Sequence, residues 1–391
     1  MKKTVYLDNA ATTMPDPRVV EAMLPYMYDA YGNASGKYSL GFKARKAIED
    51  AREKVARLIG AEPDEIFFTS GATEGNNTVL GKNIWKTLIT SDTEHKSVLK
   101  ATDVYKRNSR CFYAKTDGKC CIDIDSLKDR IEYFIKNQDV KDLSEDCYNG
   151  LVSIIRVNNE TGTEQNIKAL SDTAHEKGFL FHTDAVQAVG HIKIDVKKDG
   201  LDFLTASGHK FYGPKGIGFL YIRRGIKPYP LMYGGEQERG IRPGTENVPG
   251  IVGLGEACRI ALAEMEEDAL RVCSMSRLLK ERLLKIPGSK QNGLGDRIFN
   301  VSFEGINGQS LAIRLDMEGI CVSTGAACSS GLDERSHVLT AMGLGAYEID
   351  SSIRISIGKY NTEEEIEFAA KKTESIVSEL RELNGGYTVK D

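Results

Sequence analysis

The chain has 391 residues, of which 41% are hydrophobic and 28% are charged, and its formal net charge is −4. This composition is ordinary for a globular protein that is long enough to form two domains and to bury a sizeable core. The small net charge gives no overall preference for nucleic acid or an anionic membrane, so neither is expected as a direct partner. No apolar run approaches the roughly 20 residues that span a bilayer, and no signal sequence is apparent, so we expect a cytoplasmic protein.

Apolar runs alternate with helical patterns over about the first 225 residues. Residues 43–59 carry apolar side chains at helical spacing, and Gly60 then stops the predicted helix. Residues 93–106 also look helical. Strand-like runs lie at 66–69, 87–90, 151–157, 179–184, 201–206 and 216–223. This alternation predicts a mostly parallel sheet that is covered by helices.

The pattern changes after about residue 255. A long helical segment runs to about residue 285, and strand candidates follow at 297–303 and 353–357. Thr362 and Glu365 form a capping box, which predicts the start of a final helix. We therefore expect a large α/β domain over residues 14–255. Residues 1–13 and 256–391 are expected to form a smaller α+β domain.

An aspartate and a lysine follow two successive strand candidates. Asp184 ends the run 179–184, with Gln187 one helical turn later, and Lys210 follows the run 201–206. Pyridoxal phosphate needs this pair of groups. The lysine forms a Schiff base with it, and the carboxylate keeps its pyridine nitrogen protonated so that the ring can act as an electron sink.

Two further motifs follow strand candidates. The small residues of 70–74 would let backbone N–H groups approach a phosphate at a helix N-terminus, although most such turns are only structural. His95 begins a predicted helix, where an imidazole could stack on a cofactor ring and transfer protons. A single histidine is more often structural, so these two motifs indicate a cofactor site only in combination with Asp184 and Lys210.

Asn158 and Arg354 are candidates for polar contacts to a ligand. Asn158 ends the run 151–157, so it either donates to the phenolic oxygen of the cofactor or caps a turn. Arg354 lies between apolar residues, which predicts a partly buried guanidinium that needs an anionic partner. The α-carboxylate of an amino acid suits this group, and an internal salt bridge is the alternative.

The eight cysteines are scattered, and no pair has CxxC spacing, so free thiols and no metal site are expected. Cys328 differs from the others because it lies in 323–331, a run made almost entirely of small residues. Such a run has no bulk with which to pack, which is typical of a mobile loop. An exposed thiol there is a candidate nucleophile, and an inert surface cysteine is the alternative.

Seven motifs carry a resemblance to a known family when they are taken together and in order. They are YLDNAATT (6–13), SGATE (70–74), TEHKSV (93–98), VNNETG (157–162), HTDAVQAVG (182–190), SGHKFYGPKGIG (207–218) and RPGTENVPGIVGLG (242–255). They resemble the cysteine desulfurases, which are pyridoxal-phosphate enzymes of the class V aminotransferase family. The long loop before the SSIR motif at 351–354 resembles the nitrogen-fixation and iron–sulfur-cluster subgroup. The resemblance implies fold type I, with a mostly parallel seven-stranded sheet in a large domain and a smaller α+β C-terminal domain.

The resemblance also implies roles for individual residues. Lys210 is implied to bind pyridoxal 5′-phosphate covalently, Asp184 to contact its pyridinium nitrogen, and Gln187 to donate to its phenolic oxygen. His95 is implied to stack on the ring and to act in acid–base catalysis, and Cys328 to carry the persulfide. The implied substrate-binding residues are Asn33, Asn158 and Arg354. The implied phosphate ligands are Ala72, Thr73, Ser207, His209 and, from the partner subunit of a homodimer, Thr245.

The implied reaction converts L-cysteine to L-alanine and moves the sulfur to Cys328 and then to an acceptor protein, for iron–sulfur cluster assembly or tRNA thiolation. The sequence departs from the family pattern at Tyr38, where a histidine is expected, at Ala326, where serine is usual, and at Arg335, where proline is common. These changes bear on substrate-side detail and leave every group that the chemistry needs.

Other functions remain open at this stage. Another class V lyase or transaminase, such as a selenocysteine lyase, is the nearest alternative, and an inactive paralogue that acts as a scaffold is a second. The complete set of Lys210, Asp184, His95, Cys328 and Arg354 favours an active enzyme because each has a separate role. A dinucleotide-binding enzyme is disfavoured because no GxGxxG with a following acid comes after the first strand.

Overall fold

The structure is a computed structural model that describes residues 4–81, 84–106, 110–137, 150–226, 229–324 and 335–385. Its largest sheet has seven strands, and β8 is antiparallel to both of its neighbours whereas the other pairs are parallel. The order is β2 (Ile66–Thr69), β8 (Gly218–Ile222), β7 (Phe203–Ser207), β6 (Leu180–Asp184), β5 (Leu151–Ser153), β3 (Leu88–Ser91) and β4 (Cys111–Ala114). The predicted mostly parallel seven-stranded sheet is confirmed. Most of its strands are buried along their whole length, which is why they read as continuous apolar runs.

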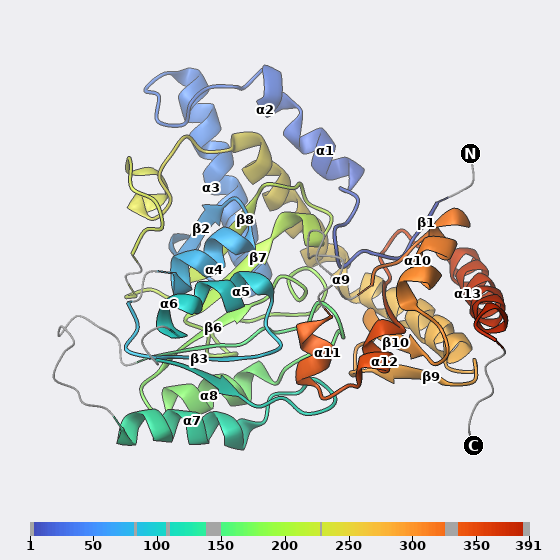
Figure 1. The fold of residues 1–391 in the computed structure, drawn as a ribbon. Helices are drawn as coiled ribbons and strands as arrows, with labels where there is room; N and C mark the ends of the chain where they lie inside the picture. The colour runs from blue at the N-terminus through green and yellow to red at the C-terminus, as the bar shows by residue number, and fades with distance from the viewer. Residues whose placement is uncertain are drawn as a thin grey trace.

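Helices cover this sheet and lie beside it in the left-hand body of the molecule (Figure 1). They are α1 (Pro17–Met23), α2 (Pro25–Tyr28), α3 (Ser39–Ile59), α4 (Ala72–Leu80), α5 (Lys96–Ala101), α6 (Asp103–Lys106), α7 (Ile124–Lys136) and α8 (Ile167–His175). Helix α4 packs on β7 and β8, whereas α7 and α8 pack on β4 and β6. Short 3₁₀ turns lie at Pro63–Glu65, Gly208–Lys210 and Gln237–Gly240.

Two predicted elements differ from those in the structure. Residues 93–106 form two helices rather than one, because the hydroxyl of Thr102 donates to the carbonyl oxygen of Leu99 and competes with the helical backbone bonds. The run 151–157 forms a strand only over Leu151–Ser153. The rest of that run leads into a turn that begins at Asn158.

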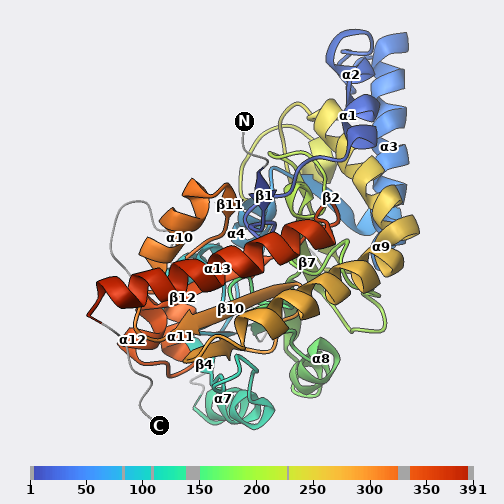
Figure 2. The same cartoon turned by 90° about the vertical axis from the view of Figure 1, so that its right-hand side faces the viewer.

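The second part of the molecule lies at the right of Figure 1. Strands β12 (Ser352–Ser356), β10 (Ile298–Phe303) and β9 (Ser289–Asn292) form an antiparallel sheet, and β1 (Val5–Tyr6) pairs in parallel with β11 (Ile320–Cys321). Its helices are α10 (Gly308–Met317), α11 (His337–Ala341), α12 (Ala346–Asp350) and α13 (Glu363–Leu383). Thr362 caps α13 with Glu365, as predicted. Figure 2 shows α13 crossing this part beside the long helix α9 (Val248–Leu283).

Helix α9 belongs to two hydrophobic cores. Its residues as far as Ile260 pack in the core beneath the seven-stranded sheet, and its residues from Val272 onward pack in the core of the second part. Val5 and Leu7 belong to that second core, so the N-terminal segment crosses back to it. The predicted domain boundary at residue 255 stays a prediction, and the change of core falls a few residues later within the same helix. No helix in the described part of the chain is long and apolar enough to cross a membrane.

The close packing of α9 against α3 in the large core can be tested by substitution. A Cβ on Gly255 would lie 2.7 Å from the Cα of Ala51, a backbone atom that cannot rotate away. Gly255→Ala should therefore lower the free energy of unfolding by about 1–3 kcal/mol, measured by urea denaturation. Gly253→Ala is the matched control on the same helix, because its Cβ would first meet the flexible side chain of Met23. Equal losses in both variants would contradict this account of the packing.

Candidate active site

A cavity of about 500 Å³ lies at the carboxyl ends of the parallel strands, where the two parts of the chain meet. Residues that follow β2, β3, β5, β6 and β7 line it from the large sheet, and residues 10–12 and Arg354 line it from the other part. The predicted site residues on its wall are Ala72, Thr73, His95, Asp184, Gln187, Ser207, His209, Lys210 and Arg354. The fold thus brings together groups that are far apart in the sequence.

Lys210 is presented by the 3₁₀ turn that follows β7. Its Nζ donates hydrogen bonds to the carbonyl oxygens of Ala10 at 2.7 Å and Ala11 at 2.8 Å. The backbone of this turn is bound to the same N-terminal segment, because the N–H and hydroxyl of Thr13 both donate to the carbonyl oxygen of His209. The amine is therefore aimed across the cavity toward residues 10 and 11.

Asp184 ends β6 and is almost fully buried. Its Oδ2 accepts a hydrogen bond from Nδ2 of Asn76 at 2.8 Å, and its Oδ1 accepts one from the backbone N–H of Val186. Asn76 is a site residue that the sequence analysis missed. It lies on α4, one turn after Thr73, and its inward position on that helix was the available signal.

His95 caps α5, and Asn76 links it to Asp184. The His95 Nδ1 accepts the N–H of Ser97 and lies 2.8 Å from the hydroxyl of Ser97, which in turn accepts from Asn76. Because Nδ1 is an acceptor, the proton of a neutral ring sits on Nε2. Burial lowers the pKa of His95 below its usual value, although the negative charge of Asp184 opposes this, and the positive charge of Lys210 also lowers it. The imidazole is therefore neutral and oriented at neutral pH.

The N-terminus of α4 forms one end of the cavity, at Ala72 and Thr73. Gly71 precedes it with a φ of 152°, and a Cβ at this residue would lie 3.1 Å from Oγ of Ser207. His209 lies on the wall as well, and burial lowers its pKa to about 4. Helical N–H groups, a hydroxyl and a neutral imidazole are a donor set that suits an anion such as phosphate.

Gln187 and Asn158 have different positions in the structure. Nε2 of Gln187 donates to the carbonyl oxygen of Ala10 at 2.9 Å, and this side chain lines the cavity. Asn158 is fully buried, donates to the carbonyl oxygen of Thr93, and accepts the N–H groups of Glu160 and Thr161. It therefore caps a turn, which was the alternative interpretation of this residue. Its contact with a ligand stays a prediction, and the neighbouring Asn159 is the residue that lines the cavity.

Arg354 on β12 forms the internal ion pair that the sequence left open. Its Nη2 donates to Oδ1 of Asp8 at 2.7 Å, and its Nη1 donates to the carbonyl oxygen of Asn159 at 3.1 Å. Its Nε is buried and has no hydrogen-bond partner among the described residues. The guanidinium thus lines the cavity and keeps a donor that no described residue satisfies.

Besides Asn158, two predicted site residues that the structure describes are not on the cavity wall. Asn33 is exposed in the loop before α3, where its Oδ1 accepts the N–H of Ser35. Thr245 is exposed in the segment before α9. Cys328 lies outside the described residues. On either side of it, Ser323 pairs through its backbone with Arg354, and the ring of His337 bonds the carbonyl oxygen of Glu94, so both flanking segments are fixed near the cavity.

Two departures from the family pattern have structural partners. Tyr38 lies over Gly36, where a Cβ would come within 2.4 Å of the ring, so the two residues fit each other. Arg335 forms a double hydrogen bond to the carboxylate of Asp350 on α12. Ala326 lies outside the described residues.

Glu94 is fully buried beside this site. Its Oε1 accepts from the Ser91 hydroxyl at 2.7 Å and from the N–H of Ile155 at 3.0 Å, whereas its Oε2 has no partner among the described residues. Burial raises the pKa of Glu94 to about 8, and the negative charge of Asp184 adds to the rise. The carboxyl is therefore mostly protonated at neutral pH, a property that the sequence analysis did not predict.

Comparisons with known proteins show similarity along nearly the whole chain. The model of the aminotransferase class-V family matches residues 5–368. Cysteine desulfurase IscS of Methanosarcina thermophila is 44% identical, over 98% of this chain and 94% of that protein. Cysteine desulfurase IscS of Dictyoglomus turgidum is 42% identical, over 98% of this chain and 97% of that protein.

Solved structures show the same similarity. A NifS-like protein superposes with a TM-score of 0.86 at 37% identity, over 97% of this chain and all of that chain. SspA, solved in complex with cysteine, superposes with a TM-score of 0.76 at 34% identity, over 92% of this chain and all of that chain.

The raised pKa of Glu94 predicts a pH-dependent stability. Folding favours the protonated form, so this group stabilises the protein fully below the unfolded pKa of 4.5, and the contribution is lost as the pH rises to about 8. Glu94→Gln should remove this dependence. The stability of the wild type relative to the variant should fall between pH 5 and 8, by up to about 1.4 kcal/mol per unit, in urea denaturation.

Glu53 is exposed, so Glu53→Gln is the control for the simple loss of a charge. The difference in the free energy of unfolding between this variant and the wild type should stay constant over the same pH range. A pH-independent difference for Glu94→Gln would show that Glu94 is ionised in the folded protein.

Proposed function

This chain belongs to the aminotransferase class-V family, among its cysteine desulfurases, and we propose that it uses pyridoxal 5′-phosphate to convert L-cysteine to L-alanine. In this proposal the sulfur passes to Cys328 and then to an acceptor protein. One observation carries the proposal. A single cavity joins an amine (Lys210), a buried carboxylate (Asp184) and a guanidinium with an unsatisfied donor (Arg354).

The groups on the cavity wall fit the cofactor. The volume of about 500 Å³ is within the usual range of small-molecule sites. Lys210 would bind the aldehyde carbon, Asp184 would accept the pyridine N–H, and His95 would lie on the ring face. The N-terminus of α4, with Ser207 and His209, would hold the phosphate, and Gly71 leaves the room that a Cβ would fill.

When bound, pyridoxal phosphate supplies an electron sink for the charge that develops at the α-carbon of an amino acid. The side chains of this chain then move the protons. Lys210 would be the base for the α-carbon proton, and the carbonyl groups of Ala10 and Ala11 orient its Nζ. His95, neutral with its proton on Nε2, can give and take a proton at the substrate.

Arg354 is the proposed site for the substrate carboxylate. Its Nε is already desolvated and unsatisfied, so a carboxylate that reaches it gains a charge-assisted hydrogen bond without further burial of the arginine. Asp8 holds Nη2 of the same guanidinium and keeps it in place beside the cavity. The substrate carboxylate therefore either binds the guanidinium together with Asp8 or displaces Asp8 from it.

Cys328 is the proposed sulfur carrier. Its thiolate attacks the substrate sulfur, so that an S–S bond forms while the Cβ–S bond breaks. The electron pair of the broken bond stays on carbon, which takes up a proton and leaves as alanine. Support for this role comes from the flanking Ser323 and His337, whose bonds to Arg354 and to the carbonyl of Glu94 place both ends of the segment at the cavity.

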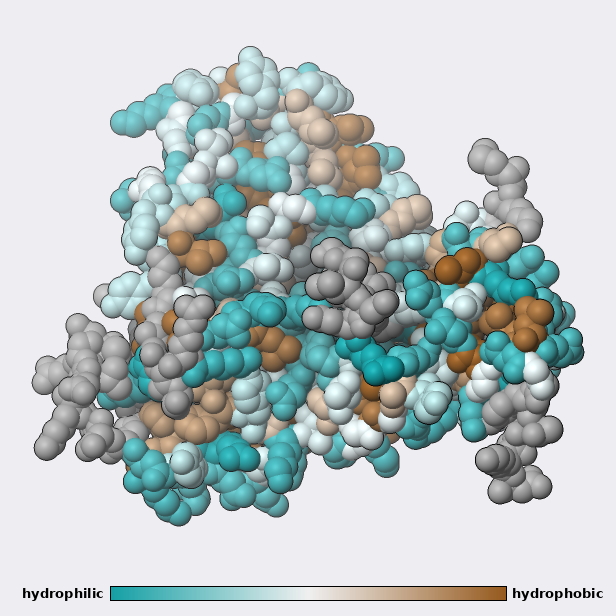
Figure 3. All heavy atoms as spheres, viewed as in Figure 1, coloured by the Kyte–Doolittle hydropathy of each residue, from teal (hydrophilic) through white to brown (hydrophobic). Residues whose placement is uncertain are grey.

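A homodimer is part of the proposal. Large apolar side chains are exposed on residues 14–42, and Figure 3 shows hydrophobic atoms on the surface over α1. They are Met14, Val20, Leu24, Met27, Tyr28, Tyr31, Tyr38 and Phe42. Such a concentration of exposed apolar side chains is typical of a protein interface. A partner subunit would bury this surface and could bring its Thr245 to the phosphate end of the cavity.

The destination of the sulfur is proposed from the subgroup that the cysteine loop resembles. An acceptor protein of the iron–sulfur scaffold or tRNA-thiolation kind would take the persulfide sulfur by attack of its own thiolate, which regenerates the Cys328 thiol.

The proposed reaction is tested with purified protein, L-cysteine and pyridoxal phosphate. Alanine should form in a reaction that depends on Lys210, and mass spectrometry should locate a persulfide on Cys328. An added thiol reductant, which supplies two electrons, should then release the outer sulfur as sulfide. Cys328→Ala should lower alanine formation by on the order of 10³-fold, since it removes the nucleophile, while cofactor absorbance persists. Cys321→Ala, which removes a partly exposed thiol on β11, is the matched control and should retain activity.

The outcomes separate the alternatives. Alanine formation that survives Cys328→Ala would identify a lyase that needs no thiol, and a 2-oxo acid in place of alanine would identify a transaminase. Failure of the wild-type protein to take up the cofactor would identify a scaffold.

Mixed dimers test whether Thr245 serves the partner subunit. Thr245→Val alone should weaken cofactor binding about tenfold, because one hydrogen bond to phosphate is lost. A dimer of one Lys210→Ala subunit and one Thr245→Val subunit should keep one intact site, with wild-type cofactor affinity and half of the wild-type activity. If Thr245 acts within its own chain, no intact site remains, and the mixed dimer shows only the weakened affinity.

A further inference from the structure

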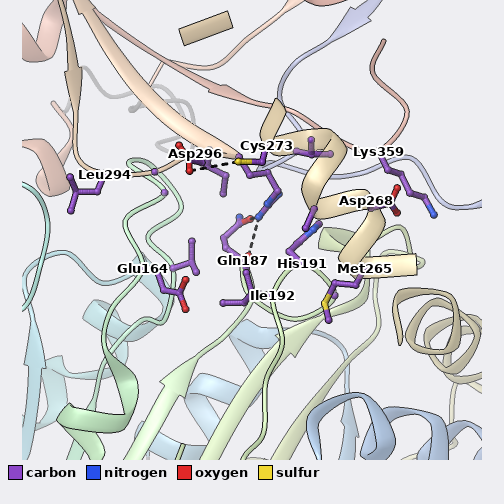
Figure 4. A pocket seen from close by; sticks show the side chains of 18 of the residues that line it. Glu164, Gln187, His191, Ile192, Met265, Asp268, Cys273, Leu294, Asp296 and Lys359 are labelled. Carbon is purple, nitrogen blue, oxygen red and sulfur yellow. Dashed lines mark hydrogen bonds between the residues drawn. The ribbon is translucent and has the colours of Figure 1, made fainter. Parts of the chain in front are cut away.

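A second cavity, of about 280 Å³, adjoins the active-site cavity, and Figure 4 shows the side chains that line it. The loop after β6, the segment before β10 and the middle of α9 line it, so it too lies where the two parts of the chain meet. Gln187 lines both cavities. Arg297, the residue before β10, reaches Gln187 from the second cavity.

Arg297 fixes the orientation of the Gln187 amide. Its Nη2 donates to the backbone carbonyl oxygen of Gln187 at 2.9 Å and to the side-chain Oε1 at 3.2 Å. A guanidinium can only donate, so Oε1 must face Arg297 and Nε2 must face the active site. At that side Nε2 donates to the carbonyl oxygen of Ala10, which also accepts from Nζ of Lys210.

The positive charge of Arg297 has no carboxylate partner within the described residues. The adjacent Asp296 pairs instead with Lys280, and Nη1 of Arg297 is buried without a hydrogen-bond partner. Burial lowers the pKa of Arg297 to about 10. A buried cation without a counter-ion destabilises a fold, so its presence is not explained by stability. Its charge does strengthen the bond to Oε1 and polarises the amide, which makes Nε2–H a stronger donor.

The segment that carries Arg297 is locked to the large part of the chain. The N–H of Gly295 donates to the carbonyl oxygen of Thr161, and the N–H of Leu294 donates to Oγ1 of Thr163. A Cβ on Gly162 would lie only 1.9 Å from the carbonyl oxygen of Ile298, so the two backbones meet where no side chain fits. Arg297 is therefore held at a fixed distance from Gln187.

We propose that Arg297 is a positioning residue, which turns and polarises the Gln187 amide so that its N–H sets the hydrogen bonding of the cofactor's phenolic oxygen. This inference rests on the proposed function, because it requires bound pyridoxal phosphate. Arg297 itself does not line the active-site cavity, and in the proposal it does not contact the substrate. Its effect on the cofactor is transmitted only by the side chain of Gln187.

The test follows the absorbance of bound pyridoxal phosphate as a function of pH. Loss of a donor disfavours the ionised phenolic oxygen, so the proton is held to higher pH. Arg297→Met should raise the pH of the absorbance transition by about one unit, the effect of one hydrogen bond to a charged oxygen. Arg297→Lys keeps a cationic donor and should shift the transition less. Gln187→Met should match Arg297→Met, and the double variant should shift no further.

A matched variant separates positioning from stability. Arg156→Met removes another buried arginine, which pairs with Asp199, and should lower the melting temperature without moving the transition. Every variant keeps the titratable and charged groups of the cavity wall, which are Glu74, His95, Asp184, His209, Lys210, Lys215 and Arg354.

An unmoved transition in Arg297→Met or Arg297→Lys protein that binds the cofactor would overturn the inference, as would additive shifts in the double variant. If Arg297→Met does not fold, the presence or absence of the smaller shift of the absorbance transition in Arg297→Lys still tests the inference. Failure of the wild type to show any cofactor absorbance would instead overturn the proposed function, and this inference with it.

Discussion

The carbonyl groups of residues 10 and 11 are the contacts on which the site depends. They accept hydrogen bonds from Lys210 and Gln187, while the N–H of Ala10 donates to the hydroxyl of Ser356 on β12. The same short segment therefore binds the lysine turn of the large sheet and a strand of the smaller part. Because one acceptor serves two donors, the amine and the amide cannot move independently. The relative position of the two parts is set where the chemistry is proposed to occur.

A closed polar network lies behind the carboxylate. Asn76 donates to Asp184 and to Ser97 and accepts from the hydroxyl of Thr205, so both ends of its amide are satisfied in a fully buried position. Ser97 continues the network to His95. Unpaired polar groups would be costly in such surroundings, whereas a complete network holds each member in one orientation. The acid and the imidazole are thus oriented by the same asparagine.

Two arginines from the smaller part complete the electrostatics. Arg354 on β12 faces the active-site cavity beside Asp8, and Arg297 before β10 lies behind it against Gln187. Each has one buried guanidinium nitrogen without a hydrogen-bond partner in the described part of the chain. Buried positive charge at the meeting of the two parts favours a ligand that carries a carboxylate and a phosphate. Glu94, which burial keeps mostly protonated, does not offset that charge.

The sequence by itself determined the local structure and the set of chemically functional side chains. Continuous apolar runs identified most of the buried strands, Gly60 and Thr362 marked helix ends through local backbone and capping preferences, and ordered motifs identified the family. These signals are local, so they can be read without the fold. They also placed Lys210 and Asp184 at strand ends, where parallel strands bring side chains together.

Only the tertiary structure decided which groups share a surface. Asn76 and Arg297 were missed because their partners, Asp184 and Gln187, lie 108 and 110 residues away. Asn158 satisfies a turn instead of facing the cavity, and Arg354 pairs with Asp8, because each side chain bonds the acceptors that packing brings near. Burial, which protonates Glu94, is likewise a property of the whole fold.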